Sequence, residues 1–238
     1  MNPNKNSGAV SERLGMNMNE LRRTWRTMGW VGLLMAGASV GWAAEPSTPT
    51  FSQDFTQVAV GKIPDSFLVL DGLFEVKELN ENRFLELPGA PLDSFGVMFG
   101  SGAREDWGAR ARFFGTGQGR RYPVFGVSVN GVAGYRIQVS PAKRAIELLK
   151  GDEVKATFAF VWETGTWTQV RIQVRKVSDG AWKVEGKAWK DGTREPVDWM
   201  ATWNETETPI AGRAAVWGKP FSGTPIGFDD LKILPLEK

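Results

Sequence analysis

Short runs of alternating apolar and polar residues extend from residue 51 to residue 236, and none keeps the 3.6-residue period of a helix. Turn-forming pairs such as Asn130-Gly131 and Asp179-Gly180 separate the runs. Many short strands, with no helices to connect parallel strands, predict an all-β, two-sheet antiparallel sandwich. We expect strands over residues 51–55, 67–70, 73–79, 83–87, 95–99, 108–114, 124–129, 135–139, 145–149, 154–162, 167–177, 182–189, 211–217 and 228–234.

The pairing of one hairpin can be predicted to the residue. If residues 178–180 form a three-residue loop with Gly180 in the left-handed conformation, Val174 lies opposite Val184 and the apolar faces of both strands coincide. A two-residue loop would shift the register by one residue and turn apolar side chains toward polar ones. The other face of the hairpin is polar, and its one indole, Trp189, is expected opposite Gln169.

The first 44 residues are typical of a secretory signal. Arginines precede an apolar run from Met28 to Ala44, which ends in small residues. This run is shorter than the ~20 apolar residues that a membrane-spanning helix needs. We therefore expect a signal peptide (1–44), a flexible leader (45–50) and one β-sandwich domain (51–238). The expected product is exported to the periplasm, the cell surface or the medium, without a membrane span after cleavage.

The charge balance of the domain argues against a nucleic-acid partner. Residues 1–44 hold five of the 29 Lys and Arg residues and two of the 27 Asp and Glu residues, so 24 positive and 25 negative residues remain, a net charge of −1. The sequence has no basic stripe of the kind that contacts phosphates.

Two absences restrict the chemistry further. The chain contains no Cys and no His, which excludes disulfides, Ser-His and Cys-His nucleophiles, and the usual zinc and copper sites.

Asp229 and Asp230 stand side by side in the apolar segment near the C-terminus. Neighbouring side chains of a regular strand point to opposite faces, so we expect that this pair cannot act as one catalytic acid and base. Asp229 shares the face of Leu231 and Ile233, and a buried carboxylate needs partners. Two alternatives stay open: backbone amides with an Arg or Ser, or a structural Ca²⁺ held by Asp229, Asp230 and Asp54.

The segments GFDDLKI, WTQVRIQV and KAWKDGTREPVDW resemble the laminin-G-like, concanavalin A-like jelly rolls of exported bacterial proteins. The resemblance covers most of residues 51–236. It implies a jelly-roll sandwich and, as in many members, binding of carbohydrate or extracellular matrix. From that pattern, Asp229 and Asp230 are expected as structural or calcium ligands. One fold carries many functions, so the resemblance supports function only by association.

A glycosidase usually needs two carboxylates about 5 to 10 Å apart. Hydrolases of the jelly-roll fold place theirs at alternate positions of one strand, and no such run occurs here. Glu205 and Glu207 have the required spacing, but TWNETETPI is typical of a loop. The sequence therefore favours no catalytic residues, and a dyad from distant strands stays an alternative.

Sugars stack on flat indoles beside hydrogen-bonding groups. Eight of the 11 Trp residues follow residue 44. Trp189, with Arg171 near it on the polar hairpin face, fits this role best, and Trp107, Trp199 and Trp203 are expected at its rim. Within DGTREPVDW, Trp199 is expected to fold over the sheet edge, with Glu195 solvated. For each loop Trp, packing is the competing interpretation.

We therefore expect an exported, noncatalytic module that binds carbohydrate or a cell-surface polymer. A glycoside hydrolase of the same fold and a structural or assembly protein are the alternatives. The sequence leaves the oligomeric state open.

Overall fold

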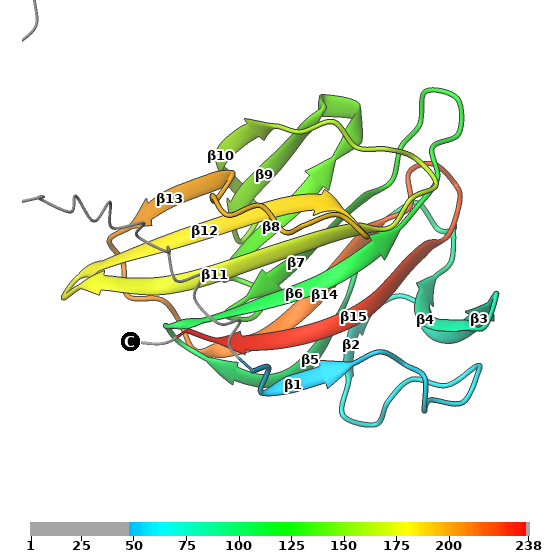
Figure 1. The fold of residues 1–238 in the computed structure, drawn as a ribbon, viewed down its shortest axis with the longest axis horizontal. Coiled ribbons are helices and arrows are strands. Elements are labelled where there is room, and N and C mark those ends of the chain that lie inside the picture. The colour runs from blue at the N-terminus through cyan, green and yellow to red at the C-terminus, as the bar shows by residue number, and fades with distance from the viewer. Residues whose placement is uncertain (1–47, 237–238) are drawn as a thin grey trace, which may run out of the picture. The chain divides into compact units, whose positions relative to one another are not determined.

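Residues 48–236, the part of the chain that the computed structural model describes, fold into two antiparallel sheets (Figure 1). The strands of sheet A are β1 (Phe51–Gln53), β3 (Glu75–Leu79), β4 (Asn82–Leu87), β6 (Trp107–Phe114), β11 (Thr168–Ser178), β12 (Ala181–Lys190), β13 (Ala201–Glu205) and β15 (Ile226–Pro235). Those of sheet B are β2 (Leu68–Asp71), β5 (Phe95–Ala103), β7 (Val124–Val129), β8 (Tyr135–Ser140), β9 (Ala145–Lys150), β10 (Glu153–Ala159) and β14 (Gly212–Lys219).

Sheet A has the order β13-β12-β11-β6-β15-β4-β3, with β1 beside β15, and sheet B has the order β10-β9-β8-β7-β14-β5-β2. The one helical element described is the 3₁₀ turn η1 (Pro141–Lys143). The predicted two-sheet jelly-roll sandwich is confirmed. The predicted signal peptide and residues 45–47 of the leader lie outside the described residues.

The core lies between the sheets, where alternate side chains of each strand meet. Phe113 of β6 and Phe125 of β7 stack across the gap with ring centroids 5.1 Å apart, and Phe228 of β15 meets Phe113 edge-on at 5.5 Å. All three rings are almost fully buried. Burying an aromatic or aliphatic side chain contributes roughly 1.5–3 kcal/mol, so this layer supplies most of the drive to fold.

The register of the β11–β12 hairpin is confirmed, with Val174 opposite Val184 and Gln169 opposite Trp189. The turn differs from the predicted three-residue loop. Ser178 pairs with Ala181, and a bulge between Lys176 and Ser178 absorbs the extra residue. A two-residue turn plus one bulged residue gives the same register as a three-residue loop.

The prediction of a loop over residues 202–210 was wrong for its first part, because Ala201–Glu205 forms the edge strand β13. An edge strand needs one partner and can carry polar side chains on both faces. The sequence pattern therefore matches that of a loop.

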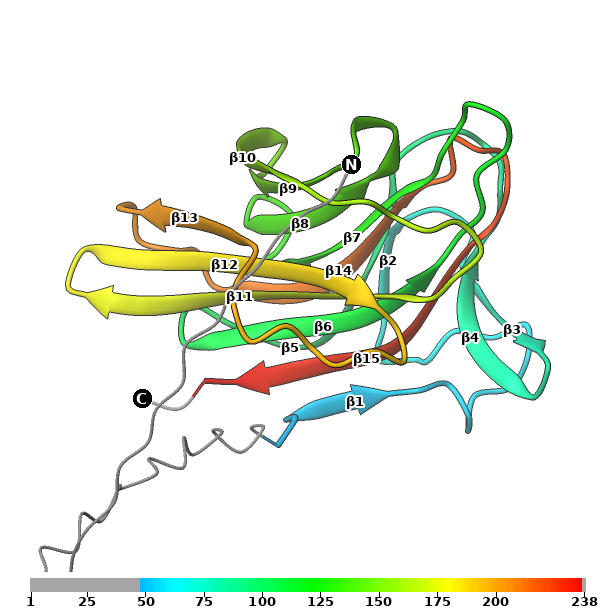
Figure 2. The ribbon, with the colours of Figure 1, turned by 45° about the horizontal axis from the view of Figure 1, so that its top comes forward.

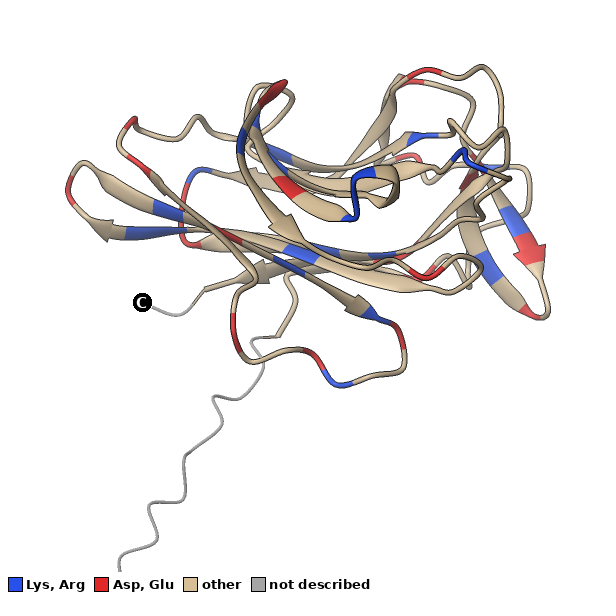
Figure 3. Cartoon of the chain, turned by 90° about the horizontal axis from the view of Figure 1, so that it is seen from above, with Lys and Arg blue, Asp and Glu red and all other residues tan. Residues whose placement is uncertain are grey.

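The first and last strands lie side by side. Phe51 of β1 pairs with Ile233 of β15, and Thr50 N–H donates to the carbonyl of Ile233 at 2.9 Å. Figure 2 shows β1 alongside β15. Lysine and arginine alternate with aspartate and glutamate over both layers (Figure 3). No helix within residues 48–236 is long and apolar enough to span a membrane.

Candidate functional site

The two neighbouring aspartates do not point apart, and that prediction was wrong. A bulge interrupts the pairing of β15 with β6 between Asp229 and Lys232, and Asp230 has a left-handed φ of 49°. The bulge breaks the alternation of a regular strand. As a result, both carboxylates reach one guanidinium: Arg112 Nη2 lies 2.6 Å from Asp229 and Arg112 Nε lies 3.1 Å from Asp230.

Arg112 lies at the centre of a polar cluster on the outer face of sheet A. Its guanidinium also lies 3.1 Å from Asp191 and donates to the side-chain carbonyl of Asn82 at 3.1 Å. Asp229 is 1% exposed and accepts a bond from the Asp230 amide at 2.7 Å. Burial raises the pKa of Asp229 even though Arg112 opposes the shift. Two sets of partners were left open for Asp229, and the structure shows one of them, a backbone amide together with an arginine.

The guanidinium of Arg112 also stacks on an indole that the sequence analysis did not select. Its central carbon lies 4.6 Å from the ring centroid of Trp167, which precedes β11. The ring centroid of Trp167 lies 5.8 Å from that of Phe84 on β4 and 5.5 Å from that of Phe114 on β6. Three aromatic rings from distant parts of the chain thus meet on one outer face, held by an ion-paired arginine.

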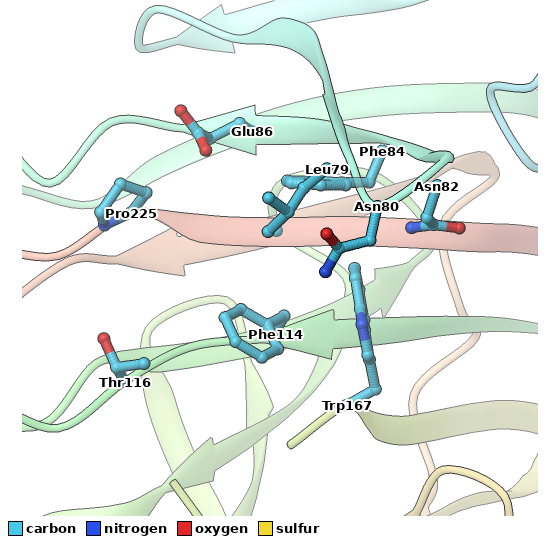
Figure 4. A pocket seen from close by; sticks show the side chains of 10 residues that line it. Leu79, Asn80, Asn82, Phe84, Glu86, Phe114, Thr116, Trp167 and Pro225 are labelled. Carbon is cyan, nitrogen blue, oxygen red and sulfur yellow. The ribbon is translucent and has the colours of Figure 1, made fainter. Parts of the chain in front are cut away.

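These rings line a pocket of about 430 Å³, called here the aromatic pocket (Figure 4). Its lining residues are Leu79, Asn80, Asn82, Phe84, Glu86, Phe114, Thr116, Trp167, Pro225 and Gly227. Gly227 pairs with both Glu86 and Phe114. Because a Cβ at Gly227 would come within 3.1 Å of the Phe84 ring, glycine lets the aromatic side chains close over β15.

Glu86 provides the acidic group of the aromatic pocket. Burial raises its pKa. The positive charge of Lys77 opposes this shift, and the negative charge of Glu75, which lies opposite Glu86 on β3, adds to it. Within residues 48–236, Glu86 has neither an ion pair nor a side-chain hydrogen bond. The pocket therefore combines apolar rings, amides and one carboxylate free to accept hydrogen bonds.

Residues 191–200, called here the strap, run along the outer face of sheet A beside β11 and β12 (Figure 3). The carboxylate of Glu195 lies 2.8 Å from both Arg171 and Lys187 and 3.5 Å from Arg110. The indole of Trp199 lies 4.5 Å from the Lys187 ammonium and 5.4 Å from the Arg171 guanidinium. The expectation of a solvated Glu195 was wrong, whereas Trp199 does fold over the sheet.

Neither residue of the preferred pair of sequence candidates is open. Trp189 points outward as predicted, but it is only 7% exposed. Arg171, its expected companion, is occupied by Glu195 and covered by Trp199. Strand alternation alone would expose Trp189, but the fold buries it. Trp189 therefore offers no open indole face.

The remaining tryptophan candidates lie elsewhere. Trp107 is 3% exposed and belongs to the core. Trp203 of β13 is half-buried beside Tyr135 at 5.8 Å, with Lys150 and Lys155 near its ring. Of the five residues predicted to bind ligand, the structure brings together Arg171, Trp189 and Trp199 on one face. It does not join Trp107 or Trp203 to them.

The predicted metal ligands do not form a cluster. Asp54 is exposed and binds the amide and hydroxyl of Thr56, and the hydroxyl bond is the main cause of its lowered pKa. Asp229 and Asp230 bind Arg112. Among residues 48–236, no three acidic side chains are grouped as a metal site. A calcium ion at these three residues stays a prediction.

The pair Glu205 and Glu207 is neutralised by Lys150, whose ammonium lies 2.8 Å from one carboxylate and 2.5 Å from the other. Glu205 also accepts a bond from the Tyr135 hydroxyl at 2.8 Å. Both carboxylates share this one lysine, and Glu205 is buried, whereas the side chain of Glu207 is 79% exposed.

No protein-family model matches the chain, and no curated protein matches it either. Solved structures share its fold at low identity. The carbohydrate binding module CBM66 from Bacillus subtilis aligns with a TM-score of 0.50 and 9% identity over 71% of this chain and 95% of that one. A protein of unknown function with a galectin-like fold from Bacillus subtilis aligns with a TM-score of 0.54 and 10% identity over 80% and 97%.

The potassium-bound carbohydrate recognition domain of Emp46p aligns with a TM-score of 0.54 and 10% identity, over 81% of this chain and 100% of that domain. At these identities the comparisons establish the fold. The chain is a jelly-roll sandwich of the type found in galectin-like proteins and carbohydrate-binding modules. Function depends on the site that the chain builds on that fold.

Proposed function

We propose that this protein is a noncatalytic module that binds carbohydrate through the aromatic pocket. The observation that carries the proposal is the meeting of Trp167, Phe84 and Phe114 beside the amides of Asn80 and Asn82 in one open pocket of about 430 Å³. Ligand sites of this size combine apolar walls with a few polar groups that set orientation.

The chemistry of a sugar matches both parts of this pocket. The C–H face of a pyranose is apolar and packs on an indole, while its hydroxyl groups need donors and acceptors. The side chains of Asn80 and Asn82 supply both, and the carboxylate of Glu86 accepts from hydroxyls. Arg112 is held by three aspartates, so it supports Trp167 and Asn82 as a positioning residue.

Related folds support the same function. The solved structures with this architecture include a carbohydrate binding module and a carbohydrate recognition domain. The pocket offers one free carboxylate, and glycosidases usually use two. We therefore favour binding over hydrolysis.

We further propose that the protein is exported and that it is related to the laminin-G-like domains that its sequence resembles. The apolar run within residues 28–44 supports export. Mass spectrometry of the mature protein tests it, since cleavage near residue 44 removes that run.

Binding of neutral oligosaccharides, measured by titration calorimetry, tests the function. We expect Trp167→Ala to weaken binding about tenfold or more, since a lost indole contact of about 1.4 kcal/mol corresponds to a factor of ten. Trp199→Ala is the matched control, because Trp199 lies on the same sheet face outside the pocket. Equal losses in both variants, or no binding of any glycan by the wild type, would contradict the proposal.

A further inference from the structure

The outer face of sheet B carries an isolated indole that the aromatic pocket does not use. Trp217 of β14 points outward, because its neighbour Val216 is buried in the core and Gly218 faces core side chains. In register, Trp217 lies opposite Gly96 on β5 and Gly126 on β7. An outward tryptophan with glycine on both neighbouring strands has no flanking side chain at either paired position.

The indole lies flat on the sheet. A Cβ at Gly96 would come within 2.7 Å of Trp217 Cε3, so the six-membered ring rests against the backbone of β5. On the other side, Trp217 Nε1 donates to the hydroxyl of Ser128 at 2.7 Å. Trp217 itself stays partly exposed. A fixed, flat, partly exposed ring is the geometry that stacking on a sugar requires.

One cation lies over this ring, and a second lies on the same strand face. The guanidinium of Arg136, from β8, lies 5.2 Å from the Trp217 centroid and is 8% exposed. Its Nε atom is buried without a hydrogen-bond partner, and the nearest carboxylate, that of the fully exposed Asp152, lies 3.5 Å from its Nη2. A nearly buried arginine with so weak a partner has unused capacity to bind an anion.

The second cation is Lys219, two residues beyond Trp217 on the same strand face. Among residues 48–236 it has no ion pair. Trp217, Arg136, Lys219, Gln138 and Gly126 together line one narrow crevice that is too small to enclose a water molecule, so a ligand here would lie on the surface of the sheet, and the lining contains no carboxylate. This charge pattern is opposite to that of the aromatic pocket, where the free charged group is Glu86.

We propose that the Trp217 face is a second glycan site and that it selects sugars bearing a carboxylate. A uronic acid ring would stack on the indole, with its carboxylate toward Arg136 and Lys219 and its hydroxyls toward Gln138. The site does not depend on the aromatic pocket, since the outer faces of the two sheets point in opposite directions. The two sites can therefore fail or succeed separately.

The matched probes are a galacturonic acid oligomer and its methyl ester, which differ in charge. Titration calorimetry of the intact protein should show binding of the acid, at least about tenfold weaker binding of the ester, and weakening by salt. Trp217→Ala and Lys219→Gln should each weaken binding of the acid. Trp167→Ala, on the opposite face, should leave it unchanged.

Trp217→Ala could weaken binding by disturbing the sheet on which the indole packs. Lys219→Gln avoids this ambiguity, because Lys219 is partly exposed. Near-ultraviolet circular dichroism confirms that each variant is folded. Equal affinity for acid and ester would overturn the proposal. So would loss of acid binding in Trp167→Ala with retention in Lys219→Gln, or the absence of any binding of the acid by the wild type.

Discussion

Arg112 links the fold to the aromatic pocket at the scale of a single residue. Its guanidinium pairs with both aspartates at the bulge of β15, donates a hydrogen bond to Asn82 and lies over the ring of Trp167. A buried carboxylate such as Asp229 is stable only with such partners. The side chain that satisfies the carboxylate therefore also fixes two lining residues of the pocket.

Replacing Arg112 should be costly for stability. We expect Arg112→Gln to lower the free energy of unfolding by about 3 kcal/mol, because it leaves the buried Asp229 without its cation. Urea unfolding measures the change. Adding Asp229→Asn should recover about 1 kcal/mol or more relative to the sum of the single changes, since the two residues are in contact.

The control for this cycle is Lys190→Gln, which breaks the exposed pair of Lys190 with Glu163. Exposed pairs contribute about 0–1 kcal/mol, so this variant should change little. Strict additivity of Arg112→Gln and Asp229→Asn would refute the role given to their contact.

At the scale of an element, the strap is held to sheet A mainly by charge. Burial alone would raise the pKa of Glu195, but the hydrogen bond from Lys187 and the charge of Arg171 hold it below its ordinary value. Burial alone would likewise raise the pKa of Asp191, but the hydrogen bonds from Gln169 and Arg112 hold it below its ordinary value. The contacts of both carboxylates, those of Glu195 and Asp191, therefore favour the ionised form.

The strap should loosen in acid. A carboxylate whose pKa is lowered by folding contributes stability above its unfolded pKa, and that stability is lost as the pH falls through the folded value. The ordinary values are 4.5 for Glu195 and 3.8 for Asp191. The protection factors of the amides of residues 191–200, which are exchange rates corrected for the intrinsic rate at each pH, should thus be unchanged from about pH 7 to about pH 5 and fall below that range.

Glu195→Gln should lower these protection factors at neutral pH and flatten their dependence on acid. Glu163→Gln, which alters an exposed ion pair with Lys190, provides the control. The same pH profile in wild type and Glu195→Gln would show that Glu195 does not hold the strap.

Elements with a clear apolar period were predictable, and the departures have local causes. Alternation along residues 170–188 gave the hairpin register, because one buried face tolerates no slip. It could not reveal the bulge at Asp229, where Asp230 adopts a left-handed conformation. Nor could it reveal the burial of Trp189, or the cover over Arg171, which depends on where the strap returns.

The aromatic pocket left one signal in the sequence. Phe84 and Phe114 occupy the outward phase of their strands, where polar residues are usual, and in ARARFF the second Phe must face outward if the first faces the core. Outward aromatics on two separate strands predict a platform, but not that β15 places them side by side. That juxtaposition needs the topology of the whole sheet.

At the scale of the whole molecule, the charge of the most buried acid of the sandwich, Asp229, is balanced by an arginine of the same sheet. Arg112 already binds Asp229 and Asp230, and Asp54 binds Thr56. We therefore expect the same melting temperature in excess calcium and in excess EDTA. A ligand that binds the folded state raises the melting temperature by mass action, so a rise with calcium that Asp229→Asn abolishes would establish the metal site instead.

The pairing of β1 with β15 has a consequence for how the domain can be attached to other chains. Phe51 lies against Ile233, whereas Gly227, at the other end of β15, lines the aromatic pocket. Any polypeptide joined at either end of the domain therefore departs from one rim, remote from that pocket. Such a module suits insertion into a host protein, and a circular permutant with a short linker across residues 50 and 236 should fold and keep its pocket.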